Sequence, residues 1–395
     1  MLLNNVTPIN ESRPVDITIS GEKITTIGTG NKWVDTGHTQ IHFTSATVFP
    51  GLINSHDHLD FNCFSVLGQR KFVSYSEWGN YIHKIYKEDI EAVLRIPQNL
   101  RTTWGIYKNL LAGITTVVNH GSYLKLEDPL INIFQEPQNL HSVRFEKNWK
   151  WKLNNPLLRN KDCVIHTGEG SDKQSSDEID QLLRFNLLKR KLVGVHGVAM
   201  NEMQAKNFKG LIWCPESNKV LLNKHAHVAS LKAQTNMVFG TDSTLTGNWN
   251  IWHHLRLARS LHQVEDAELF GMITSLPAKL WNLNNGELKV GKDADIIVVK
   301  KKSGTQTWED VFKINPEEIL LITNKGKIRM FDKSLYDQII GLPLNFHRFS
   351  KLSLKGSIKY VEGDLPSLIT AIKSYNPNVN FPFEVLEPIV NTSRI

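Results

Sequence analysis

Short apolar runs recur through the middle of this 395-residue chain, where they alternate with amphipathic segments. Such runs indicate strands buried on both faces, and strands separated by helices indicate a parallel sheet built from βα units. About eight such units are typical of a (β/α)8 barrel of the TIM type. The predicted strands are Val48–Ile53, Thr115–Asn119, Val143–Glu146, Cys163–Ile165, Leu192–Val195, Leu211–Trp213 and Met237–Phe239, and the predicted helices include Ile90–Leu111, Ser176–Lys189 and Trp249–Leu261.

The stretch between residues 120 and 163 is short for the two βα units that a complete barrel would place there. Either both units are short, or one helix is reduced to a loop. We therefore expect an α/β barrel that is least regular in this stretch.

The two ends of the chain have a different texture, with frequent turns and alternating strands. Asp16–Ile19 and Lys23–Gly28 indicate one hairpin, and Ile319–Ile328 indicates another. We expect residues 1–46 and 286–331 to form one composite β-sandwich domain beside a barrel of residues 47–285. Residues 332–395 are a C-terminal extension to which the sequence assigns no role, although Leu365–Tyr375 could form a helix.

Four of the predicted strands end in residues that bind metals. His56 and His58 follow the first strand on either side of Asp57, and alternation along an extended chain puts the two imidazoles on one face. His166, His196 and Asp242 follow later strands. Since barrel active sites lie at the carboxyl ends of the strands, we expect these side chains to meet. Imidazoles with a carboxylate suit one divalent ion, Zn²⁺ first, with Fe²⁺ or Mn²⁺ as alternatives.

Composition narrows the remaining classes of function. The formal net charge of +7 comes from scattered basic residues, and no basic stripe with interleaved aromatic residues predicts a nucleic-acid partner. The three cysteines are an odd number without CxxC spacing, which argues against a disulfide framework. No signal peptide and no run of about 20 apolar residues is visible. We expect a cytoplasmic protein that binds neither nucleic acid nor membranes.

With these pieces in place, the chain resembles the amidohydrolase superfamily, over roughly residues 10 to 330. The matching segments are Pro50–His58, Ala112–Val118, His166–Glu169, Val195–Gly197, Phe239–Asp242 and, near the end, Gly291–Asp295. Cys214–Asn218 is similar to the segment after the seventh strand in the deaminase and chlorohydrolase branch.

The resemblance implies a mononuclear site in which His56, His58, His166 and Asp242 hold the metal. It places His196 beside the attacking water. Glu169 follows His166 at the spacing of the deaminase branch, where this carboxyl protonates a ring nitrogen or leaving group. Asp242 would also accept a proton from the water. Lys147 and Lys150 lie in the stretch where binuclear relatives carry a bridging residue, but neither is a clear equivalent.

The implied activity is metal-dependent hydrolysis of carbon–nitrogen bonds, first of all deamination of a heterocyclic small molecule. Hydrolysis of a cyclic amide or of a chlorinated ring at the same site is the nearby alternative, and a non-catalytic barrel kept for binding or assembly is the alternative of another class. His120, Phe61 and Trp78 are the candidates for substrate binding. Family members often form dimers, so a homodimer is one expected assembly.

Overall fold

Two parallel sheets occupy the centre of the molecule. The computed structural model describes residues 1–29, 40–301, 307–340, 342 and 346–386. One sheet has three strands in the order β6-β7-β8, and the other has five in the order β13-β12-β11-β10-β9. Their bounds are β6 Leu52–Asp57, β7 Ile114–Asn119, β8 Asn132–Phe134, β9 Gln138–Ser142, β10 Cys163–Thr167, β11 Leu192–His196, β12 Phe208–Trp213 and β13 Asn236–Phe239.

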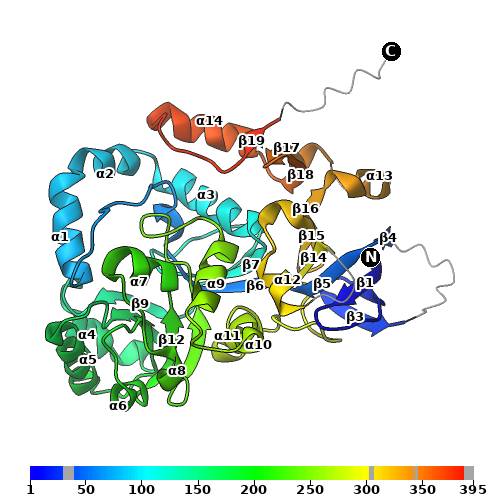
Figure 1. Ribbon diagram of the computed structural model, residues 1–395. Helices are drawn as coiled ribbons and strands as arrows, with labels where there is room; N and C mark the ends of the chain where they lie inside the picture. Colours follow the sequence, from blue (N-terminus) through cyan, green and yellow to red (C-terminus); the bar gives the residue numbers. More distant parts are fainter. Residues whose placement is uncertain (30–39, 302–306, 341, 343–345, 387–395) are drawn as a thin grey trace.

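Helices lie between these strands in the sequence and around them in space (Figure 1). They are α1 Tyr75–Ile85, α2 Lys87–Leu94, α3 Gln98–Leu111, α4 Trp149–Leu153, α5 Lys173–Phe185, α6 Glu202–Ala205, α7 Pro215–Leu222, α8 Val228–Leu231, α9 Ile251–Ser260, α10 Asp266–Gly271 and α11 Ser275–Trp281. The predicted helices over 176–189 and 249–261 correspond to α5 and α9. Each begins at a side-chain cap, in which Asp172 accepts from the amide of Ser175 and Asn250 accepts from that of Trp252.

A third sheet, of eleven strands, joins the two ends of the chain. Figure 1 shows the N-terminal strands beside β14–β16, far apart in the sequence. The order is β19 (Glu384–Val385), β17 (Phe349–Leu354), β18 (Ser357–Glu362), β16 (Lys327–Asp332), β15 (Ile319–Asn324), β14 (Ile296–Lys300), β5 (Ala46–Pro50), β1 (Leu2–Pro8), β2 (Val15–Ser20) and β3 (Lys23–Gly28), with β4 (Gln40–His42) paired to β1.

This sheet includes β17, β18 and β19, which come from the predicted C-terminal extension. The helix predicted there is confirmed as α14, Leu365–Tyr375, and two short helices precede it, α12 Trp308–Phe312 and α13 Tyr336–Ile339. Residues 387–395 of the extension lie outside the described part of the chain. The domain boundaries themselves stay a prediction.

The two parallel sheets are hydrogen-bonded to each other where the segment after β13 lies beside β6. The amides of Thr241 and Asp242 both donate to the carbonyl of His56, at 3.1 and 3.0 Å, and Asp57 forms a parallel bridge with Asp242. On the other side, only residues 135–137 separate β8 from β9, and no helix lies between them. Of the two forms expected for the stretch between residues 120 and 163, the structure therefore has the one in which a helix is reduced to a loop.

The prediction of one strand over Val48–Ile53 is wrong. The run is divided at Gly51, so that β5 pairs with β14 in the large sheet while β6 pairs with β7. A Cβ atom at Gly51 would lie 2.1 Å from the hydroxyl oxygen of Thr115, so no larger residue fits where the chain crosses from one sheet to the other.

Two further predictions fail for local reasons. Val143–Glu146 forms a turn, and the strand lies earlier, at β9, although the apolar pattern is stronger after it. The single helix predicted over Ile90–Leu111 is divided into α2 and α3 before Pro97, which caps α3, because the residue before a proline is disfavoured in the helical conformation. The other predicted strands each lie within an observed one.

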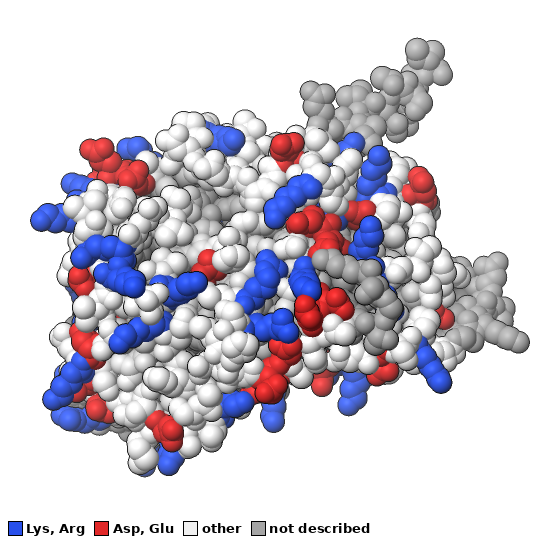
Figure 2. Space-filling view, viewed as in Figure 1, with Lys and Arg blue, Asp and Glu red and all other residues white. Residues whose placement is uncertain are grey.

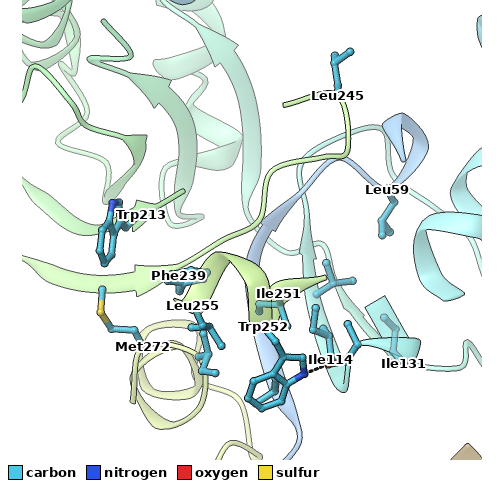
Figure 3. Close-up of a cluster of buried hydrophobic side chains, with 14 of the residues drawn as sticks. Leu59, Ile114, Ile131, Trp213, Phe239, Leu245, Ile251, Trp252, Leu255 and Met272 are labelled. Carbon is cyan, nitrogen blue, oxygen red and sulfur yellow. Dashed lines mark hydrogen bonds between the residues drawn. The ribbon is translucent and has the colours of Figure 1, made fainter. Parts of the chain in front are cut away.

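The core between the strands and α9 contains large aromatic side chains (Figure 3). Trp213 and Phe239 come from neighbouring strands, with ring centroids 6.0 Å apart. Trp252 on α9 donates its indole N–H to the carbonyl of Ala112 at 3.0 Å, which satisfies its polar group in the core. Burying a side chain of this kind stabilises the fold by about 2 kcal/mol or more.

The outer surface carries charges of both signs. Figure 2 shows Lys and Arg interspersed with Asp and Glu over the face that it presents. Among the described residues, none of the helices is long and apolar enough to cross a membrane.

Gly105 allows α3 to approach the turn that follows His58. A methyl group at this position would lie 2.1 Å from the backbone carbonyl oxygen of Leu59. We predict that Gly105→Ala lowers the free energy of unfolding by about 1–3 kcal/mol despite the better helix propensity of alanine, because two backbones must separate. Urea unfolding measures the change. Gly271→Ala is the control, because its nearest atom would be 3.7 Å away, and an equal loss in both variants would contradict the explanation.

Candidate metal centre

Three histidine side chains converge at the carboxyl ends of the parallel strands. His56 is the next-to-last residue of β6, His58 lies just beyond this strand, and His166 lies in β10. The Nε2 atom of His166 lies 3.1 Å from that of His56 and 3.4 Å from that of His58. These three residues form a group whose ligand atoms all lie within 4.8 Å of one another. The structure thus brings together residues that are 110 positions apart.

Asp242 completes this group from the segment after β13. Its Oδ1 atom lies 3.7 Å from Nε2 of His56 and 3.5 Å from Nε2 of His58. Its Oδ2 atom is held by the hydroxyls of Ser217 and Thr246, each at 2.8 Å. Asp242 has a φ angle of +62°, a left-handed conformation that non-glycine residues rarely adopt. One carboxylate oxygen is therefore fixed by hydrogen bonds while the other faces the imidazoles.

The donor set fits a divalent ion. The carbonyl of His141 can only accept, so the 2.8 Å contact with Nδ1 of His166 makes that nitrogen the donor and leaves the lone pair on Nε2. Burial, followed by the charge of His56, lowers the pKa of His58 to about 4, so this imidazole is neutral at neutral pH. Lone pairs of neutral rings and a carboxylate that point at one another repel unless a cation lies among them, and three imidazoles with one carboxylate suit Zn²⁺.

A buried acid lies beside this group. Burial raises the pKa of Glu169 well above its ordinary value, and the charges of Asp242 and Glu178 raise it further. Glu169 therefore keeps its proton at pH values where an exposed glutamate has lost it. Its Oε2 atom lies 3.5 Å from Nε2 of His196, whose pKa burial lowers to about 3. The amide of Asn218 contacts the other ring nitrogen of His196 at 3.0 Å and fixes the orientation of the ring.

A cavity of about 810 Å³ opens over the cluster. This volume is within the range of sites for small molecules. Its polar end contains His58, His120, His166, Glu169, His196 and Asp242, and aromatic side chains line much of the rest. The ring of Phe61 stacks on that of His58, with centroids 5.4 Å apart.

Every site residue proposed from the sequence lies in or beside this cavity. His56 is fully buried beneath it, and the three candidates for substrate binding, His120, Phe61 and Trp78, all line it. Trp78 uses its indole N–H on the carbonyl of Leu67, so only its ring is free to contact a ligand. The roles of these residues stay predictions. Lys147 and Lys150 are exposed and do not line the cavity.

Sequence reasoning missed two parts of the site. His141 is the next-to-last residue of β9 and lines the cavity, but the strand was predicted several residues too late, so this histidine was not placed near a strand end. Thr246 holds Asp242 from only four residues away. A hydroxyl in a loop carries no pattern of its own, so nothing in the sequence distinguishes it.

The hydrogen bonds from Ser217 and Thr246 to Asp242 lead to a prediction about metal affinity. In the double variant Ser217→Ala, Thr246→Val, Asp242 loses the bonds that orient its carboxylate, and Zn²⁺ affinity should fall by about 10- to 100-fold. Competition with a chelating dye measures this. The matched control is Ser260→Ala, Thr103→Val, whose hydroxyls bond surface helix carbonyls. Unchanged affinity in the Asp242 pair would show that these hydroxyls do not orient the ligand.

Comparisons with known proteins agree with this geometry. A sequence model of the amidohydrolase family matches residues 158–329. The chain is 28% identical over 203 residues to 5-methylthioadenosine/S-adenosylhomocysteine deaminase of Pyrococcus furiosus, which is 44% of this chain and 46% of that relative. It is 24% identical over 361 residues to 5'-deoxyadenosine deaminase of Methanocaldococcus jannaschii, which is 76% of this chain and 85% of that relative.

The fold also has solved counterparts. An adenosine deaminase of Xanthomonas campestris with bound zinc superimposes with a TM-score of 0.69 at 15% identity, covering 96% of this chain and 98% of that one. The match to the Pyrococcus deaminase spans about half of that relative's length. The family match over residues 158–329, the deaminase relatives and the shared fold together make this chain similar to the amidohydrolase superfamily.

Proposed function

We propose that this protein is a metal-dependent aminohydrolase that deaminates a heterocyclic small molecule. The observation that carries the proposal is the buried Glu169, whose pKa burial raises, beside His196 at the edge of a three-histidine, one-aspartate cluster in an open cavity. Hydrolysis of an aminated ring needs a base for the attacking water, an acid and a group that stabilises developing negative charge. The cluster offers a residue for each of these three roles.

His56, His58, His166 and Asp242 would hold the metal, and Zn²⁺ is the ion that we propose. When bound, the ion supplies the acidity that lowers the pKa of a coordinated water to about 7. Asp242 Oδ1 accepts the proton of the attacking water and returns it to the amino group, which leaves as ammonia when the carbon–nitrogen bond breaks. His196 orients that water and stabilises the negative charge that develops on its oxygen. Glu169 donates its proton to a ring nitrogen, which makes the carbon more electrophilic.

The relatives' names suggest the heterocycle. The matched curated proteins are named as deaminases of adenine nucleosides, and we infer that this chain takes a 6-aminopurine or a ring of similar size. The aromatic side of the cavity, with Phe61, Phe64, Trp78 and Phe145, suits a flat ring with an apolar substituent. The composition of the lining thus supports a nucleoside-like substrate.

We also propose that the eight parallel strands form a single (β/α)8 barrel. The bonds between the segment that follows β13 and His56 on β6 support closure on one side. Near the short β8, the side chain of Asn139 on β9 donates to the carbonyl of Asn119 on β7 at 3.0 Å, which supports closure on the other side. The large sheet of the two chain ends would then be the companion β-sandwich domain.

The assay that tests the function is release of ammonia from adenosine, 5'-methylthioadenosine and 5'-deoxyadenosine by protein with a measured Zn²⁺ content. We predict that Glu169→Gln lowers kcat by about 10²- to 10⁴-fold with an unchanged metal content, because glutamine cannot supply the proton. Asp177→Asn, on the exposed face of α5, is the control. Chelated protein should be inactive and should recover with Zn²⁺.

Other outcomes separate the alternatives. Ring opening without ammonia would indicate a cyclic amidase, and release of chloride from a chlorinated ring would indicate a chlorohydrolase. A chain that binds no metal and whose cellular role survives Asp242→Ala would be a non-catalytic binding protein.

The charge of the cavity generates a prediction about the substrate. Among the described residues that line it, none is Lys or Arg, and its carboxylates at Asp60 and Glu146 are already paired with Arg101 and Lys152. An anionic substituent would lose its hydration without meeting a Lys or Arg side chain among these lining residues. We therefore predict that kcat/KM for 5'-methylthioadenosine exceeds that for adenosine 5'-monophosphate by about 10- to 100-fold.

A variant that gains activity on the monophosphate tests whether the lack of a basic side chain in the cavity explains this preference. Asn80 is exposed on α1 and lines the cavity. Asn80→Lys should raise kcat/KM for the monophosphate and leave that for the neutral nucleoside nearly unchanged, whereas Asn80→Gln should change neither. Equal turnover of neutral and phosphorylated nucleosides by the unmodified protein would contradict the prediction.

A further inference from the structure

The residue between the two histidines, Asp57, points away from the metal cluster into a buried polar network. Its Oδ2 atom accepts from Nζ of Lys108 and from the side-chain amide of Asn109, both at 2.8 Å. Its Oδ1 atom accepts from the side-chain amide of Asn62 at 2.8 Å. The side chains of Asp57 and Lys108 are both 0% exposed. None of the proposed catalytic steps uses this pair.

Lys108 connects this network to the opposite side of the cluster. Its ammonium also donates to the hydroxyl of Thr241 at 3.3 Å, and Thr241 precedes Asp242. Asn54 reinforces the connection, because its side chain donates to the same hydroxyl at 2.8 Å and accepts from the amide of Thr241 at 3.1 Å. One buried cation on α3 therefore contacts both the strand that carries His56 and the segment that carries Asp242.

Backbone hydrogen bonds also connect the strand that carries His56 to the segment that carries Asp242. The amide of Asp242 donates to the carbonyl of His56 at 3.0 Å, and the amide of His58 donates to the carbonyl of Asp242 at 3.3 Å. Asp242 holds its left-handed conformation within these contacts. A shift of Thr241 relative to Asp57 would therefore move the carboxylate relative to the two imidazoles.

We propose that Lys108 is a positioning residue for the metal centre: its ion pair with Asp57 and its bond to Thr241 set the spacing between His56, His58 and Asp242. This inference rests on the metal centre proposed above. Lys108 touches neither metal nor substrate in this account, and it acts through the residues beside the ligands.

A buried ion pair gives the proposal a sharp test, because stability and positioning respond differently to its removal. Removing one partner leaves an uncompensated buried charge and destabilises the fold, whereas replacing both partners by neutral residues of similar volume is often neutral for stability. A role confined to folding would therefore be restored in the double variant, and a role in positioning would not.

The experiment compares Asp57→Asn, Lys108→Met and the double variant, with Zn²⁺ and Co²⁺ as the only added ligands. Each single variant should have a lower unfolding temperature and bind Zn²⁺ about 10- to 100-fold more weakly, as expected when partners of metal ligands are lost. The double variant should regain most of the unfolding temperature yet stay at least about tenfold weaker in Zn²⁺ binding. The visible absorption of bound Co²⁺ should differ from that of the unmodified protein.

A second variant keeps the test decisive if the double variant fails to fold. Thr241→Val removes the bonds from Lys108 and from Asn54 without unpairing a charge, and it should weaken Zn²⁺ binding with little change in unfolding temperature. The matched control is Lys359→Met, Asp332→Asn, the fully buried lysine of the large sheet and its partner at 2.7 Å. This control should leave Zn²⁺ affinity unchanged whatever it does to stability.

The outcomes distinguish the two claims. An unmodified protein that binds no Zn²⁺ would overturn the metal centre itself. A double variant or a Thr241→Val variant that binds Zn²⁺ as tightly as the unmodified protein, with the same Co²⁺ spectrum, would overturn the positioning role and leave Lys108 a purely structural residue.

Discussion

The carbonyl of His56 accepts from the amides of both Thr241 and Asp242, and the rest of the site depends on this contact. This contact joins β6 to the segment that follows β13. It therefore fixes the edge of the parallel sheets where the carboxyl ends of the strands lie. Three histidines and an aspartate from distant parts of the chain then face one point. These backbone bonds bring the proposed metal ligands together, and Lys108 is proposed to set their spacing.

Burial gives the same residues their chemistry. Desolvation disfavours charge on imidazoles and carboxyls alike, so it lowers the pKa of His196 and raises that of Glu169. For Asp242, burial also acts upward, but the hydrogen bond to His56 and the charges of His58 and His56 lower its pKa overall. Two carboxyl groups in one cavity thus take opposite states, an acid at Glu169 and a carboxylate at Asp242. This difference is what an acid–base mechanism requires.

The C-terminal segment packs against two aromatic residues of α3. Trp104 on α3 packs against Phe381 with ring centroids 4.9 Å apart, and it donates its indole N–H to the carbonyl of Asn62 at 2.7 Å. Tyr107 on the same helix donates to the carbonyl of Glu362 at 3.1 Å. The extension to which the sequence assigned no role therefore packs on the helix that carries Lys108, which links the end of the chain to the residues around Asp57.

The sequence by itself determined the strand ends that carry His56, His58, His166, His196 and Asp242, because ligand-type residues after short apolar runs form a local pattern. It also determined most of the parallel strands. It could not place His141 or divide the run at Gly51, since a turn and a change of sheet depend on contacts with residues far along the chain. Only the tertiary structure decided that Asp57 pairs with Lys108 and that Glu169 keeps its proton, because burial and the distance between partners exist only in the folded chain.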